Sequence, residues 1–232
     1  MLRNSFIAIL IVGFGLMLWI SLVRDYKAPE ELNRTAAYYN ANEVEQIGAA
    51  NVVTAVVVTY RGLDTLGEVT VLFLTATVIG FFLRRSKNKE ERKDTGSELM
   101  ATASKILVPG SIILGTYVFV NGHLTPGGGF QGGAVIGTAI LLMTMANPKN
   151  LISMKVFHWI ESLSGVFYVL LGLAGLILAG GFLDTTFLPK GQLLSLLSAG
   201  AIPLIYSMIG LKVGAEISGI VLGINDANTK AE

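Results

Sequence analysis

Apolar segments of membrane-spanning length dominate the hydrophobic pattern of this chain. The first, Ser5–Val23, holds about 19 residues, enough to cross a hydrocarbon core of roughly 30 Å as a helix. Only Arg3 precedes this run and no small-residue cleavage site follows it, so we predict a transmembrane helix rather than a signal peptide. Further apolar runs cover residues 63–83, 105–120, 130–145, 156–180 and 193–224. The pattern predicts an all-α integral membrane protein with about six transmembrane helices.

One apolar stretch is too long for a single crossing. Asn51–Leu83 has about 33 residues, roughly 50 Å as one straight helix. We therefore predict a short lateral or re-entrant helix over Asn51–Tyr60, a break near Gly62, and a spanning helix that starts near Leu63. The polar segment Tyr26–Ala49 is predicted to be an extramembrane loop.

The C-terminal apolar stretch, Leu193–Ile224, is also longer than one crossing, and Pro203 can kink it. Lys212 and Glu216 lie four residues apart in this stretch, on one face of a helix. If the hydrocarbon core begins near Leu196, Lys212 reaches the cytoplasmic edge. If the core begins near Pro203, both charges are buried. The sequence leaves these two placements open.

Composition supports a membrane protein and excludes several kinds of function. The chain is 52% hydrophobic and 14% charged, whereas soluble domains are about one-quarter charged. It has no cysteine and only two histidines, which excludes a cysteine-ligated iron–sulfur cluster and a c-type haem within this chain. We therefore predict no cofactor and no metal site. A net charge of +1 argues against a nucleic-acid partner.

Charged residues cluster at the predicted break. Asp64 and Glu68 are four residues apart on one helical face, and Arg61 can pair with Asp64. Carboxylates inside a membrane are costly unless paired or hydrated, and they commonly mark an ion or proton route. The alternative is a salt bridge at the membrane surface. Glu161 is expected to make an interfacial hydrogen bond.

A glycine-rich stretch, Asn121–Gly133 (NGHLTPGGGFQGG), separates two apolar segments and predicts the turn of a membrane hairpin. An ordinary surface turn is the alternative, but six glycines beside a histidine and a glutamine favour a re-entrant, packed segment. The residues predicted to shape this turn are Pro126, Gly127, Gly128, Gly129, Gly132 and Gly133.

The motif Gly122–Gly133 resembles the signature of the B subunit of Mrp-type (Mnh-type) multisubunit cation/proton antiporters. It is similar to the matching subunit of membrane-bound hydrogenase-type respiratory complexes. Ile209–Glu216 resembles the end of the same B subunits. Tyr60–Glu68 (YRGLDTLGE) resembles a motif near the C-terminal end of the large A subunit, which occurs as a separate small subunit in the hydrogenase relatives.

These resemblances imply a membrane subunit of a Na⁺/H⁺ antiporter assembly, with other antiporter-module membrane subunits, lipid, Na⁺ and H⁺ as partners. In the family, the glutamate at the position of Glu68 is associated with ion movement, so we expect it to be paired or hydrated rather than exposed. The residues predicted to lie on the ion or proton path are Arg61, Asp64, Glu68, His123, Lys212 and Glu216. Two other functions stay open: the same module in a redox-driven complex such as a membrane-bound hydrogenase or sulfane reductase, and a purely structural scaffold.

Basic residues predict the topology and the division into modules. Six of them lie in Arg84–Lys93, which also marks the expected seam between an N-terminal module, residues 1–96, and a B-subunit-like module, residues 97–232. One alternating set of loops holds about 11 Lys and Arg residues and the other about four. By the positive-inside rule, both termini are cytoplasmic in a multi-pass protein of the cell membrane, and His123 lies on the outer side.

Overall fold

The computed structural model describes residues 2–24, 31–85, 97–147 and 153–229. All regular secondary structure in these ranges is helical, so the predicted all-α fold is confirmed. The chain divides into two compact units, Met1–Tyr38 and Tyr39–Glu232. Among the described residues, five helices of the second unit are long and apolar enough to cross a membrane, and the first unit adds a shorter apolar helix. This agrees with the predicted number of about six spans.

The first unit contains the apolar helix α1 (Leu2–Leu18), which continues as the π-helical turn η1 (Trp19–Arg24). Large apolar side chains such as Ile9 and Phe14 are exposed along it. A helix that is apolar on all sides suits a lipid environment. These two elements correspond to the predicted first span.

The polar segment predicted to be a loop contains a helix, α2 (Arg34–Gln46), so that prediction is wrong. Asn33 starts the helix, because its side-chain oxygen accepts a hydrogen bond from the amide three residues later, at 2.8 Å. Glu43 and, just beyond the helix, Ile47 are buried. Few of the described positions in this segment are buried. Its sequence is therefore mostly polar and has no apolar run that would have predicted a helix. Residues 26–30 of the predicted loop lie outside the described residues.

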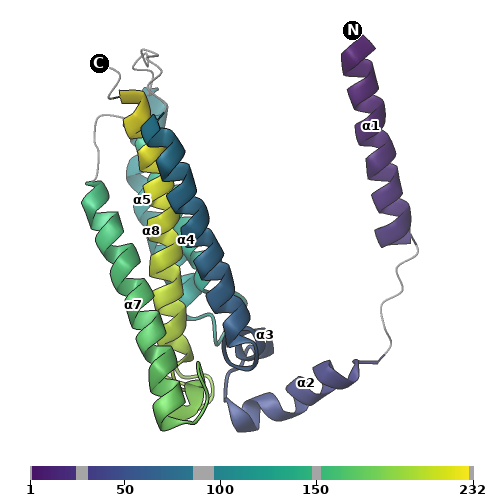
Figure 1. Ribbon diagram of the computed structural model, residues 1–232, viewed down its shortest axis with the longest axis vertical. Coiled ribbons are helices and arrows are strands. Elements are labelled where there is room, and N and C mark those ends of the chain that lie inside the picture. Colours follow the sequence, from purple (N-terminus) through teal and green to yellow (C-terminus); the bar gives the residue numbers. More distant parts are fainter. Residues whose placement is uncertain (1, 25–30, 86–96, 148–152, 230–232) are drawn as a thin grey trace. The chain divides into compact units, whose positions relative to one another are not determined.

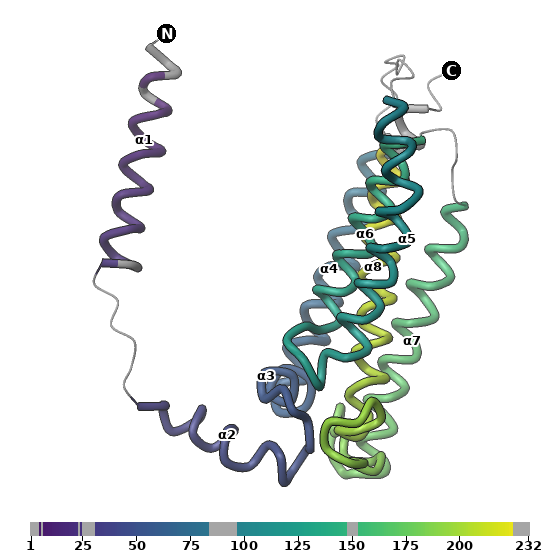
Figure 2. Tube along the Cα trace, turned by 180° about the vertical axis from the view of Figure 1, so that it is seen from behind, coloured from purple at the N-terminus to yellow at the C-terminus, as the bar shows by residue number. Residues whose placement is uncertain are grey.

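The short helix predicted before the break is present. It consists of α3 (Val52–Ala55) and the π-helical turn η2 (Val56–Tyr60), and the side chain of Asn51 caps its first turn. Figure 2 shows it nearly end-on while the long helices run lengthwise, so it lies across the end of the bundle. The helix breaks at Arg61, and α4 (Gly62–Arg85) begins directly afterwards.

The five long apolar helices of the second unit run side by side (Figure 1). After α4 come α5 (Glu98–Val120), α6 (Gly129–Ala146), α7 (Met154–Leu178) and α8 (Ile202–Thr229). Helix α8 is central, since it contacts all four others. Helix α4 packs mainly against α8, and only 6% of its apolar span is buried within this chain. One long apolar face of the protein is therefore open at α4.

Two helix starts differ from the prediction. Helix α5 begins before the predicted Lys105, because the hydroxyl of Ser97 accepts the Met100 amide at 3.2 Å and caps the helix. Pro109 lies inside α5, as expected. Residues 193–201 form turns instead of helix, and α8 starts only at Ile202. Pro203 thus lies in the first turn, where its missing amide hydrogen is not needed, and the predicted kink there is wrong.

Glycines let α6 approach its neighbours closely. A Cβ atom at Gly133 would lie 2.7 Å from the Cβ of Val213, and one at Gly129 would lie 2.6 Å from the Cβ of Ile209. A Cβ atom at Gly132 would collide with the backbone of α5. Because lipid supplies no hydrophobic force between helices, such close contact is a main source of their association.

Candidate functional site

An ion pair lies in the interior of the central helix. The Nζ atom of Lys212 is 2.6 Å from Oε1 of Glu216, and the two side chains are 10% and 0% exposed. The ammonium group lies 4.9 Å from the centre of the Phe73 ring on α4. On the other side, a Cβ atom at Gly165 of α7 would lie 3.7 Å from it. Both side chains are thus buried within the helical bundle, while the position of the hydrocarbon core along α8 stays a prediction.

The carboxylate of Glu216 has a free side. Its Oε2 atom is buried and has no hydrogen-bond partner among the described residues. The negative charge of Glu161, on α7, also acts on this carboxylate. Glu161 in turn lies 3.6 Å from Nδ1 of His158, which is exposed. In place of the expected interfacial hydrogen bond, the partly buried Glu161 side chain makes this 3.6 Å contact with a titratable ring.

Glu68 lies on α4 near the start of the helix. Its side chain is exposed on this chain, because α4 is covered along one side only, and the expectation that it is paired or hydrated stays a prediction. Its charge acts on Tyr168 of α7, which is only 2% exposed. The predicted pair is present: Nη2 and Nε of Arg61 lie 2.5 Å and 2.6 Å from Oδ2 of Asp64, and both residues are exposed.

These groups form a seam between α4, α7 and α8. We define it by Glu68, Tyr168, Lys212, Glu216 and Glu161. Tyr168 and Glu161 lie on the inward face of α7, seven residues apart, which is two turns. The seam thus runs along the bundle from the start of α4 toward the start of α7, with a titratable or hydroxyl side chain at each level.

Sequence reasoning missed Tyr168 and Phe73. Each lies in an apolar run, where an aromatic side chain is normally interpreted as a packing residue. The neighbouring sequence does not show that a charged residue of another helix lies close to it. The spacing of Glu161, Gly165 and Tyr168 at i, i+4 and i+7 could have indicated a common face on α7. Their partners on α4 and α8 are visible only in three dimensions.

The glycine-rich turn is packed, as predicted. Asn51 fastens it: its Nδ2 donates to the carbonyl oxygens of Gly122 and Thr125 at 3.0 Å and 3.1 Å. The hydroxyl of Thr54 donates to the same Gly122 oxygen at 2.6 Å. The backbone amide of Asn51 donates to the carbonyl oxygen of His123 at 3.1 Å. The N-terminal end of α3 thus holds the turn between α5 and α6.

His123 lies in this turn and not in the seam. Its ring is fully buried, and Nε2 is 3.4 Å from the carbonyl oxygen of Ser195. Burial lowers the pKa of His123, against the opposing effect of nearby backbone oxygens, so the ring stays neutral at pH 7. Its place on an ion or proton path stays a prediction, as do the roles of the other predicted path residues.

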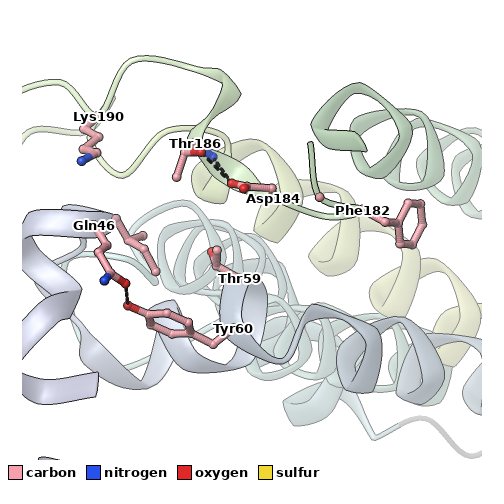
Figure 3. Close-up of a pocket in the computed structure, with 9 residues that line it drawn as sticks. Gln46, Thr59, Tyr60, Phe182, Asp184, Thr186 and Lys190 are labelled. Atoms are coloured by element: carbon pink, nitrogen blue, oxygen red, sulfur yellow. Dashed lines mark hydrogen bonds between the residues drawn. The ribbon is translucent and has the colours of Figure 1, made fainter. Parts of the chain in front are cut away.

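A pocket of about 510 Å³ opens at this end of the bundle, beside η2 and the loop after α7 (Figure 3). Its lining includes the side chains of Gln46, Thr59, Tyr60, Phe182, Asp184, Thr186 and Lys190. The hydroxyl of Tyr60 donates to Oε1 of Gln46 at 2.6 Å, and the Thr59 hydroxyl lies 2.8 Å from that of Thr185. No group of three or more potential metal ligands of the histidine, cysteine and carboxylate types occurs in the part of the chain that the structure describes.

Comparison with known proteins places this architecture among membrane complexes. One solved structure, of the archaeal membrane-bound sulfane sulfur reductase, contains a chain 41% identical to this one, with a TM-score of 0.78; the match covers 96% of this chain and 98% of that chain. The structure of the Mrp complex from Dietzia sp. DQ12-45-1b contains a longer chain with the same fold, at 24% identity and a TM-score of 0.70. That match covers 97% of this chain and 26% of the longer one.

Among curated sequences, the uncharacterized protein MJ1307 of Methanocaldococcus jannaschii is 32% identical over 196 residues, covering 72% of this chain and 74% of the relative. Two family models match consecutive parts of the chain. Residues 1–98 match the MbhE family of MBH subunits, and residues 99–219, more than half of the chain, match the domain related to the MnhB subunit of the Na⁺/H⁺ antiporter. The chain therefore belongs to the family of membrane proteins with an MnhB-related domain, preceded here by a region of the MbhE type.

Proposed function

We propose that this chain is an integral-membrane subunit of a multisubunit Na⁺/H⁺ antiporter-type assembly, and that its seam lines part of the ion or proton path. The observation that carries the proposal is the Lys212–Glu216 pair, buried in the central helix with one carboxylate oxygen unpartnered. Buried charges in a membrane protein are costly, and they face a partner charge or a hydrated route. A purely structural helix contact would be better served by apolar residues.

The other members of the seam could carry protons or cations to and from this pair along the bundle. Glu68 stands at one end and Glu161 at the other, with Tyr168 between the levels of Glu68 and Lys212. Carboxylate, phenol and ammonium groups can all exchange protons, and carboxylates also bind monovalent cations. The exposed face of α4 has to be covered by another membrane subunit, because lipid would not tolerate the Glu68 carboxylate.

Isosteric loss of charge tests the proposal. In the assembled complex, Glu68→Gln and Glu216→Gln should each lower cation-dependent proton exchange at least tenfold, while the complex still purifies intact. Glu98→Gln makes the same chemical change at the exposed N-terminal end of α5 and should leave exchange unchanged. Exchange is measured by a pH-sensitive dye in vesicles that contain the whole complex. Normal exchange in both seam variants would leave only the scaffold function.

A second candidate function has its own supporting observation. The 41% identity and near-complete overlap with a chain of the sulfane sulfur reductase complex favour a redox-driven ion pump as the parent assembly. In that case this chain supplies the same seam, and other subunits supply the electron carriers. Mass spectrometry and iron analysis of the purified complex distinguish the two, since iron–sulfur proteins are expected only in the redox assembly.

The orientation and the modules are part of the proposal. We place both termini in the cytoplasm, and we divide the chain into modules 1–96 and 97–232. The basic segment Arg84–Lys93 suggests both, and its residues 86–93 lie outside the described residues. Reporter fusions test the orientation: a phosphatase that is active only outside should be inactive at either terminus and active when inserted after Lys190.

A further inference from the structure

We propose that the pocket beside η2 binds a partly hydrated monovalent cation, such as Na⁺, and is the mouth through which that cation exchanges with the seam. The inference rests on the proposed function and adds to it a binding site with its own residues. The oxygen-rich lining of the pocket and its position support this assignment.

Oxygen atoms suited to a hard cation surround the pocket. Figure 3 shows Thr59 and Tyr60 on one side and Asp184 and Thr186 on the other, with Gln46 beside Tyr60. Hydroxyl, amide and carboxylate oxygens are the ligands that Na⁺ and similar hard cations prefer. A volume of about 510 Å³ is far larger than the roughly 30 Å³ that one water molecule occupies in the liquid, so the ion can keep part of its hydration.

One carboxylate, that of Asp184, and one ammonium group, that of Lys190, line the pocket. Oδ1 of Asp184 accepts hydrogen bonds from the amide and the hydroxyl of Thr186, at 2.9 Å and 2.7 Å, and Oδ2 is left for a ligand. One carboxylate is too little for tight binding of a divalent cation, which prefers several. At the rim, the ammonium group of Lys190 is 2.5 Å from the carbonyl oxygen of Glu45 and weakens cation binding by repulsion.

The pocket lies where the seam reaches the end of the bundle. Tyr60, in its wall, is separated from α4 only by Arg61, and Glu68 lies about 9 Å further along the helix axis. The opposite wall follows α7: a Cβ atom at Gly175 would lie 2.5 Å from the backbone of Asp184. The pocket therefore lies between the first residues of α4, the helix that carries Glu68, and the last residues of α7, the helix that carries Tyr168.

The test measures the half-saturating Na⁺ concentration on each face of the membrane, with the whole complex in right-side-out and in inverted vesicles. On the face that carries the pocket, Asp184→Asn should raise this concentration at least fivefold, with a maximal rate within twofold of wild type. Thr59→Val should raise it two- to threefold. Lys190→Gln should lower it, a change that a damaged fold cannot produce. On the other face, all three variants should behave as wild type.

Glu45→Gln is the matched control, because Glu45 is exposed near the same rim without lining the pocket. It should leave the half-saturating concentration within a factor of 1.5. Unchanged values for Asp184→Asn and Lys190→Gln on both faces would overturn the pocket proposal, and so would equal changes on both faces. If those values are unchanged while Glu68→Gln still lowers exchange at least tenfold, only the pocket proposal fails. Normal exchange in Glu68→Gln would instead reject the proposed function.

Discussion

Replacing Lys212 by methionine separates the structural from the functional contribution of the buried ion pair. Methionine keeps the length and the apolar stem of lysine and removes the ammonium group. Glu216 would then lose its only hydrogen bond among the described residues, the 2.6 Å contact with Nζ, and both of its oxygens would be buried without a partner.

The size of the effect follows from the burial of the pair. Removal of one partner from a buried ion pair costs about 3–5 kcal/mol, because the other charge is left uncompensated. Loss of the contact with the Phe73 ring adds about 0.5–2 kcal/mol. For a chain of this size, 1 kcal/mol corresponds to roughly 2–4 °C in melting temperature, so Lys212→Met should melt at least about 6 °C below wild type.

The double variant Lys212→Met with Glu216→Gln makes the pair neutral. Its melting temperature should recover to within about 4 °C of wild type, since buried pairs can be replaced by neutral residues with little loss. Cation-dependent proton exchange should stay lost. The assay is thermal unfolding of the purified complex, followed by size-exclusion chromatography, with exchange measured in parallel. A single Lys212→Met variant that melts like wild type would refute the reasoning, and a double variant that regains exchange would make the pair structural only.

Three further predictions address other parts of the molecule. Gly129→Val should block assembly more strongly than His123→Ala, since a side chain at this glycine collides with α8; Gly219→Val, with no neighbour within 4 Å, is the control in a pull-down of the complex. Burial raises the pKa of Glu43, so its stabilising contribution is complete below about pH 4.5 and is lost as the pH rises through the raised value. Glu43→Gln should therefore gain melting temperature over wild type at pH 8 and not at pH 4. Asn51→Ala removes a helix cap and two hydrogen bonds to the turn, so it should cost about 2–4 kcal/mol, read as faster proteolysis at the turn.

The lengths of the apolar runs were enough to predict the spans, because a segment that crosses lipid has to form its backbone hydrogen bonds within its own helix. They also predicted the break before α4, since Asn51–Leu83 is too long for one crossing. Helix α2 was missed because it is polar. The length of an apolar run identifies only helices that cross the membrane and gives no information about polar helices. The start of α8 could not be found from Pro203 alone, because a proline suits both a kink and a first turn.

The candidate site was only partly predictable. The spacing of Lys212 and Glu216 predicted their pairing, as did that of Arg61 and Asp64, because one helix determines both distances. Contacts between helices carry no such local signal. The effect of the Glu68 charge on Tyr168 depends on how α4 and α7 are both arranged around α8, which no spacing along either helix encodes.

The hydrogen bonds from Asn51 to the glycine-rich turn also bear on the order in which the helices enter the membrane during synthesis. Asn51 and its acceptor Gly122 are 71 residues apart in the sequence. At about 5–20 residues per second, the ribosome needs roughly 4–14 s to make that stretch. During this interval the Asn51 side chain and the Thr54 hydroxyl have no turn to bind, and hydrocarbon offers them no substitute. We therefore expect the α3 segment to wait at the membrane surface until the α5–α6 hairpin has been inserted.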